Sequence, residues 1–148
     1  CVELRQTAYI DRLMSTYAPD GAPPKSRRPP CDSDLAQLVA DALCISLDDI
    51  DPAARKRFQS IVGALLYCAT NTRPDVAYAV GMLCRVMARP TPELEAAALQ
   101  VLYYLHHTRE LGLRYEADQR ELSGMSDSDW AVKHSTTGWC FMYSQAAI

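Results

Sequence analysis

The middle of the chain follows a helical period of hydrophobic and polar residues. Between residues 53 and 107, apolar positions recur at intervals of three and four in three consecutive runs, which places each run on one stripe of a helix. The runs are Ile61, Val62, Leu65 and Leu66; Val76, Val80, Leu83, Cys84 and Met87; and Leu94, Ala97, Ala98, Val101, Leu102 and Leu105. Because three such stripes can bury one another, the pattern predicts three helices packed together.

Two segments that contain proline predict where these helices break. Pro74 cannot continue a preceding helix but suits the first turn of a new one, and Asp75 adds a negative charge near that helix N-terminus. Thr91 and Pro92 supply an N-cap and a first helical residue for the third helix in the same way. We therefore expect breaks near 71–74 and near 89–92.

The chain before this unit predicts two shorter helices and a linker. An apolar face over 7–18 predicts the first helix. Residues 19–30 hold five of the nine prolines and predict an extended linker. A second short helix follows, with Asp32 or Ser33 as its N-cap, and Asp51 is expected to cap the helix that begins at Pro52.

After residue 109 the hydrophobic period changes from 3.6 to 2. Strands are predicted over 112–116, 121–127 and 138–144, with Trp139, Phe141 and Tyr143 on one face of the last. The expected fold class is therefore α+β, a helical unit followed by the beginning of a sheet.

Composition narrows the picture. The chain has 148 residues, 49% hydrophobic and 22% charged, with a net charge of −3. These values are typical of a soluble globular protein, and we expect an intracellular protein because the sequence shows neither a signal peptide nor an apolar run of about 18 residues. Proteins that bind nucleic acid unaided are usually basic, so the charge argues against strong binding by this chain alone.

The residues that most often bind metals or phosphates give little signal by spacing. The six cysteines include no pair at CxxC spacing, which disfavours a zinc site or a disulfide framework and fits a reducing compartment. His106 and His107 are adjacent and so project from different faces of a helix, against joint ligation of a metal. The basic cluster Lys25, Arg27 and Arg28 is either a solvated part of the linker or a phosphate contact.

A series of short motifs, in their order and spacing, resembles the Copia/Ty1 class of retrotransposon Pol polyproteins. The match is close over 58–148 and weaker over 4–14. The motifs are Ser60-Ile61-Val62-Gly63-Ala64-Leu65-Leu66-Tyr67, Thr72-Arg73-Pro74-Asp75-Val76-Ala77-Tyr78, Pro90-Thr91-Pro92-Glu93, Val101-Leu102-Tyr103-Tyr104-Leu105, Leu111-Gly112-Leu113, Ser126-Asp127-Ser128-Asp129-Trp130-Ala131 and Ser135-Thr136-Thr137-Gly138.

In that family, this run joins the end of the reverse transcriptase to the start of ribonuclease H. The resemblance implies a thumb-like helical segment over 1–18, a proline-rich linker with a short helix over 19–51, and a helical connection unit over 52–109. Residues 110–148 would then be the first antiparallel strands of an incomplete ribonuclease H-like domain. The palm of the polymerase, with its metal-binding aspartates, is not among these residues.

Asp127 is the residue to which the resemblance assigns chemistry. It follows Met125 and Ser126 at the end of a predicted strand, where the ribonuclease H family places its first metal-binding carboxylate. Two divalent ions about 4 Å apart activate water in such sites, and Mg²⁺ favours carboxylate oxygens. Asp129 is the second candidate, since it would share the face of Asp127 if the strand continued. From the residues alone, Asp127 is equally interpretable as a surface aspartate.

The implied parent activities are RNA-directed DNA synthesis and cleavage of RNA in an RNA–DNA hybrid. The implied partners are that hybrid, the remainder of the Pol polyprotein and Mg²⁺, with no membrane. We expect this chain alone to be inactive, because the other carboxylates of the family lie beyond position 148. The segment between Ala131 and Ser135 is also shorter than the family pattern, which puts any substrate contact there in doubt.

A second class of function stays open. The chain begins at Cys1 and ends at Ile148 without a helix stop or polar tail, so we expect it to derive from a longer protein. A domesticated remnant of that protein could act as a non-enzymatic module, binding a protein partner through an exposed apolar stripe on its helices.

Overall fold

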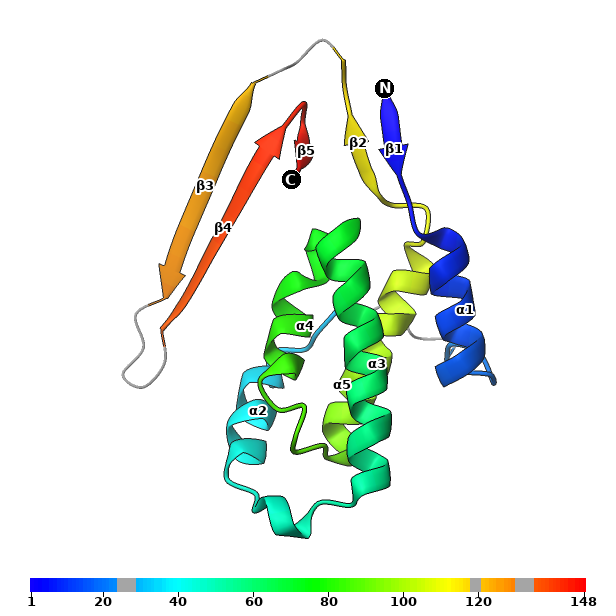
Figure 1. The fold of residues 1–148 in the computed structure, drawn as a ribbon, viewed down its shortest axis with the longest axis vertical. Helices are drawn as coiled ribbons and strands as arrows, with labels where there is room; N and C mark the ends of the chain where they lie inside the picture. The colour runs from blue at the N-terminus through cyan, green and yellow to red at the C-terminus, as the bar shows by residue number, and fades with distance from the viewer. Residues whose placement is uncertain (24–28, 118–120, 130–134) are drawn as a thin grey trace. The chain divides into compact units, whose positions relative to one another are not determined.

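The computed structural model describes residues 1–23, 29–117, 121–129 and 135–148. They form two compact units: a helical unit of residues 5–111, and a strand unit that combines residues 1–4 with 112–148 (Figure 1). Helices and antiparallel strands thus occupy separate units, which confirms the α+β class.

The helical unit contains five α-helices. They are α1 (Thr7–Tyr17), α2 (Leu35–Leu43), α3 (Pro52–Asn71), α4 (Ala77–Cys84) and α5 (Pro92–His107), with single 3₁₀ turns η1 (Leu47–Asp49) and η2 (Pro74–Val76). Helix α5 contacts each of the other four. The three predicted central helices are therefore confirmed as α3, α4 and α5, and the chain breaks at Pro74 as the sequence indicates.

One apolar cluster holds these helices together. The buried stripe of α3 faces those of α4 and α5 in the same cluster, and α1 and α2 add their own buried faces. Its fully covered members include Ile10, Phe58, Val62, Leu65, Val76, Val80, Leu83, Leu94, Leu102 and Leu105. Leu66, counted in the predicted stripe of α3, lies at its edge and is 41% exposed.

Capping side chains fix the starts of α3 and α5. The two carboxylate oxygens of Asp51 accept hydrogen bonds from the backbone of Ala53 (3.2 Å) and Ala54 (3.1 Å). The Thr91 hydroxyl accepts one from the Leu94 N–H at 3.2 Å. Each satisfies N–H groups that the first turn of a helix leaves unpaired, and both predicted caps are confirmed.

Two boundaries differ from prediction. The N-cap position of α2 is Asp34 rather than Asp32 or Ser33, and it makes no side-chain capping bond; the carboxylate of Asp32 instead accepts a hydrogen bond from Gln100. Helix α4 ends at Cys84, so the second break starts earlier than residue 89. The Arg89 guanidinium holds the following turn by donating to the Ile45 carbonyl at 2.9 Å, a long-range contact that the hydrophobic period does not encode.

The strand unit contains two small antiparallel sheets. Strand β1 (Val2–Leu4) pairs with β2 (Leu113–Tyr115), and β3 (Leu122–Asp129), β4 (Thr136–Tyr143) and β5 (Ala146–Ala147) form a sheet in that order. The three predicted strands are confirmed as β2, β3 and β4, within two residues at each end. β1 and β5 were not predicted.

None of the helices in the described part of the chain combines the length and the apolar composition that a membrane crossing requires.

Candidate functional site

Strand β3 carries Asp127 on its exposed surface. The β3–β4 pair is in continuous register from Leu122 opposite Tyr143 to Asp129 opposite Thr136, and this register sets Asp127 opposite Gly138. The Asp127 side chain is exposed, and its Oδ1 accepts a hydrogen bond from the N–H of Ser128 at 2.9 Å. The sequence prediction of a carboxylate on a strand is therefore confirmed in its placement, while its chemistry stays a prediction.

The face opposite to Asp127 is aromatic. Residues directly across an antiparallel pair project to the same face, and successive residues alternate. Trp139, Phe141 and Tyr143 therefore share a face, as predicted, with exposed fractions of 70%, 49% and 39%. Asp127 projects to the other face, with Met125 and Cys140.

The neighbours of Asp127 in its motif are less fully defined. Strand β3 continues to Asp129, as sharing a face with Asp127 requires, but the Asp129 side chain lies outside the described part of the structure. Trp130 and the shortened segment between Ala131 and Ser135 also lie outside the described residues. The predictions for these residues, and those for Lys25, Arg27 and Arg28, are therefore not tested.

The donor chemistry at Asp127 suits Mg²⁺, since an exposed carboxylate is the ligand that this ion favours. Among the described residues, no group of three or more His, Cys, Asp or Glu side chains is arranged to hold a metal ion. A cavity of about 310 Å³ in the strand unit is lined by Glu121, Ser123, Met142 and Gln145, without Asp127. These residues therefore offer one ligand of the expected kind, fewer than a two-metal site needs.

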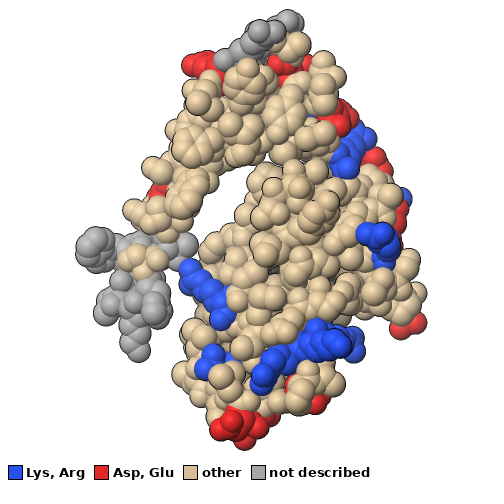
Figure 2. All heavy atoms as spheres, in the orientation of Figure 1, with Lys and Arg blue, Asp and Glu red and all other residues tan. Residues whose placement is uncertain are grey.

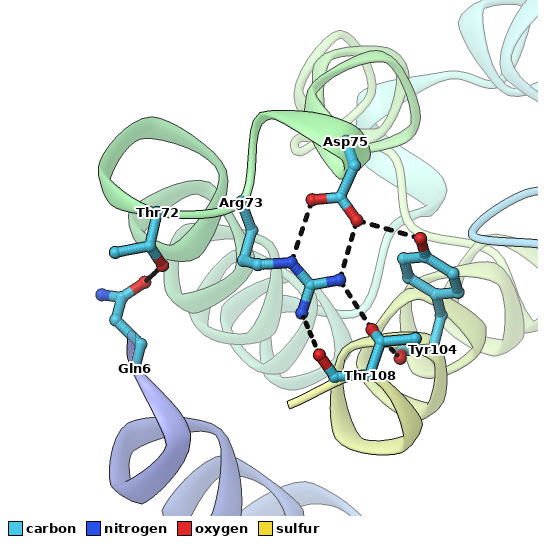
Figure 3. A network of polar contacts seen from close by, with 6 residues as sticks. All are labelled: Gln6, Thr72, Arg73, Asp75, Tyr104 and Thr108. Carbon is cyan, nitrogen blue, oxygen red and sulfur yellow. Dashed lines mark hydrogen bonds and ion pairs between the residues drawn. The ribbon is translucent and has the colours of Figure 1, made fainter. Parts of the chain in front are cut away.

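The helical unit holds a polar network that the sequence analysis missed (Figure 3). Arg73 is 1% exposed. Its Nε and Nη2 donate to the two carboxylate oxygens of Asp75 at 2.9 and 2.7 Å, and its Nη1 and Nη2 donate to the carbonyl and hydroxyl oxygens of Thr108 at 3.1 and 2.6 Å. The guanidinium thus joins the α3–α4 connection to the C-terminal end of α5.

Tyr104 completes the network. Its hydroxyl donates to Asp75 Oδ2 at 2.9 Å, and its ring lies 5.5 Å from the Arg73 guanidinium carbon. Burial raises the pKa of Asp75, but the hydrogen bonds and charge of Arg73 and the Tyr104 hydroxyl outweigh it, so the net pKa is lowered. The carboxylate is therefore held ionised. The local signal was the Thr72-Arg73-Pro74-Asp75 motif, which gives Asp75 a helix-start role but does not reveal its partners.

Charged side chains of the helical unit largely pair with one another. Arg57 contacts Glu95 at 2.9 Å, and Arg109 lies 3.6 Å from the carboxylate of Asp11. His106 Nδ1 lies 3.5 Å from the same carboxylate. On the face shown in Figure 2, the described Lys and Arg side chains lie in separate groups with neutral surface between them.

Comparison with known proteins identifies the family. The chain is 31% identical, over 98% of its length, to the retrovirus-related Pol polyprotein from transposon TNT 1-94 of Nicotiana tabacum. It is 36% identical, over 69% of its length, to a putative transposon Ty5-1 protein of Saccharomyces cerevisiae. The chain belongs to the retrotransposon Pol polyproteins. This confirms the family recognised from the motifs.

The Pol relatives are longer than this chain. It spans 11% of the tobacco polyprotein and 33% of the yeast protein. A Pol-like sequence also occurs in a protein of another title: the chain is 40% identical, over 62% of its length, to a secreted RxLR effector protein of Plasmopara viticola, of which it spans 68%. No family model and no solved structure matches the chain.

Proposed function

We propose that this chain is the part of a Copia-type Pol polyprotein that connects the reverse transcriptase to the start of ribonuclease H. The observation that carries the proposal is the order of its parts: a packed helical unit, then a strand with an exposed aspartate in the family's Ser-Asp motif. The whole polyprotein would copy RNA into DNA and cleave RNA in the resulting hybrid. Its partners would be the hybrid and the remainder of Pol.

Within this proposal, Asp127 is the first carboxylate of the ribonuclease H site. Its exposed oxygens would hold Mg²⁺, and such an ion when bound activates water and stabilises the leaving oxygen. Asp129 is assigned a place outside the first coordination shell. The helical unit would position the strands rather than bind nucleic acid strongly, since the net charge is −3 and several arginines are engaged in ion pairs.

The decisive experiment uses a full-length Pol polyprotein that contains this segment. Asp127→Asn keeps the shape of the side chain but removes the charge that holds a divalent ion. It should lower cleavage of a labelled RNA–DNA hybrid by about 10²–10³-fold or more, the size of effect seen when one electrostatic stabiliser is removed. DNA synthesis by the same preparation should stay largely intact, because the two activities use separate carboxylates.

Asp129→Asn is the matched control, with the same chemical change two residues away. It should reduce cleavage much less than Asp127→Asn. If Asp129→Asn alone abolishes cleavage, the ligand has been assigned two residues too early. If both variants cleave the hybrid at the wild-type rate, the assignment of this strand to ribonuclease H is wrong.

A non-enzymatic interaction module is the second candidate function. The observation that favours it is the relative from Plasmopara viticola, whose printed title is that of a secreted effector and not of a polymerase. Sequencing of the complete transcript separates the two candidates. A reading frame that continues after Ile148 into a Glu-bearing helix and a later Asp supports the enzyme, whereas a stop codon at that point supports the module.

The proposed function also places the chain inside the cell, where RNA is copied. The secreted title of the oomycete relative belongs to that protein alone. Fractionation of cells that express the chain under its own reading frame, followed by immunodetection in lysate and medium, would test this. Recovery from the medium would contradict it.

A further inference from the structure

The residue opposite Asp127 lacks a side chain. In the β3–β4 register Gly138 is the direct partner of Asp127, so a side chain at 138 would project to the same face as the carboxylate. A Cβ built on Gly138 has no other atom within 4 Å. The surface beside Asp127 is therefore open on the β4 side.

Neither backbone conformation nor packing within the described chain explains this glycine. Gly21 is the only described glycine with a positive φ, so Gly138 has a backbone that any residue can adopt. Gly124 in β3 provides the contrast, because a Cβ there would lie 3.0 Å from the ring of Phe141. Gly124 makes room for a neighbouring ring, whereas Gly138 makes room for nothing in the described structure.

A glycine inside a strand carries a cost, since it loses more backbone freedom on folding than other residues and packs no side chain. Strand glycines often mark a bulge, a bend or the close approach of a ligand. The register through Gly138 is continuous, without a bulge. The approach of a ligand is the explanation that the position opposite an exposed carboxylate supports.

We propose that Gly138 keeps open the space in which the Asp127 carboxylate takes up a hydrated divalent cation, a positioning role that rests on the proposed function. Mg²⁺ retains several of its waters when it binds one or two carboxylates, so it needs more room than a bare ion. A branched side chain at 138 would occupy that room without touching Asp127 chemically. Gly138 thus governs access of the ion, and Asp127 supplies the charge.

The test uses the 148-residue chain and Mn²⁺, a paramagnetic substitute for Mg²⁺. Weak binding is followed by the selective broadening of backbone amide signals of residues 126–128 and 137–139 in ¹⁵N–¹H spectra, and excess Mg²⁺ should reverse it. Gly138→Val should raise the Mn²⁺ concentration at half-broadening by about tenfold, and Gly138→Ala by about threefold. The denaturation midpoint of both variants should equal or exceed that of wild type, because Val and Ala lose less entropy than Gly.

Two controls separate this inference from the proposed function. Asp127→Asn should abolish the selective broadening, and Gly63→Ala, a change at an exposed glycine of α3 with equally open surroundings, should leave it unchanged. If Gly138→Val binds Mn²⁺ as wild type does while Asp127→Asn does not, the role of Gly138 is wrong and the Asp127 site stands. If Asp127→Asn retains the broadening, or wild type shows none, both fall. Should Gly138→Val give poorly dispersed spectra, Gly138→Ala decides.

Discussion

Arg73 is the largest fully buried side chain in the described chain, and it carries a charge. A buried charge is costly unless it is paired and hydrogen-bonded. Asp75 neutralises it in a two-bond, planar geometry, and Thr108 satisfies further donors. Thr72 extends the polar connection by donating from its hydroxyl to Gln6 at 2.7 Å (Figure 3). Four sequence-distant segments thus meet at one connection between helices.

Replacing Arg73 should destabilise the helical unit strongly. Arg73→Met removes the charge but fills part of the volume, and leaves the Thr108 carbonyl and the Asp75 carboxylate without their main donor. We expect a loss of about 3 kcal/mol in the free energy of unfolding, towards the low end for a broken buried pair because the Asp75 side chain is 37% exposed. Urea denaturation followed by circular dichroism measures it. Arg73→Lys keeps the charge but lacks the planar fork, and should recover only part of the loss.

Arg57→Met is the matched control, since Arg57 also pairs with a carboxylate but is 62% exposed. It should cost less than about 1 kcal/mol. Acid titration adds a second test. Because the pKa of Asp75 is lowered in the folded state, its stabilising effect is present above the unfolded value of about 4 and is lost as the pH falls through the folded value. Asp75→Asn should therefore lose less stability than wild type over that acid range. Equal losses would contradict the role of this carboxylate.

At the scale of elements, the sequence predicts what is local. The helical period locates α1, α3, α4 and α5, and the residue pairs Asp51-Pro52 and Thr91-Pro92 locate the starts of α3 and α5, because caps and stripes are encoded within a few residues. β1 escapes prediction because it has three exposed residues and gains its structure by pairing with β2, more than a hundred residues away. The Arg73 network escapes for the same reason: the motif is visible, but its partner Thr108 on the far side of α5 is not.

β5 shows a different limit. It follows β4 through Ser144 and Gln145, both with positive φ (51° and 70°), as in the tight turns that favour Asn-Gly or Gly-containing pairs. A sequence of Ser-Gln carries no such signal. The strand of two alanines that follows adds none either. The turn is therefore imposed by the pairing of β4 with β5 and by the Glu116 N–H, which donates to the Ser144 carbonyl at 3.0 Å.

This turn gives a prediction for the strand unit. Gln145→Gly removes the Cβ that disfavours a left-handed backbone, and should raise the free energy of unfolding by about 0.5–1 kcal/mol. Gln145→Ala removes the same side-chain atoms beyond Cβ but keeps the unfavourable conformation, so it should give no such gain. Chemical denaturation of both variants, followed by the fluorescence of Trp139 and Trp130, provides the comparison. A larger gain from Ala than from Gly would show that the backbone of residue 145 is not what limits stability.

At the scale of the whole molecule, the candidate site could be predicted only in part. The motif around Asp127 indicated a carboxylate on a strand, and the register of β3 with β4 places it on an exposed face. The role of Gly138 could not be predicted, because it depends on which residue lies across the pair and on what surrounds it. A single carboxylate does not make a two-metal site, and the described residues bring no group of three metal-ligating side chains together.

That count leads to the last prediction, that the purified 148-residue chain has no hybrid-cleaving or polymerase activity with Mg²⁺. Two-metal hydrolysis requires several carboxylates to hold both ions about 4 Å apart, and Asp127 alone would bind an ion too weakly to keep one in place at millimolar concentration. Incubation with a labelled RNA–DNA hybrid and with a primed RNA template measures both activities. Asp127→Asn is the internal control, because residual cleavage that persists in this variant comes from a contaminating nuclease. Cleavage that survives stringent purification and disappears in Asp127→Asn would show that these residues assemble a complete site, and that the remaining ligands lie in the loop and strand ends around Asp127.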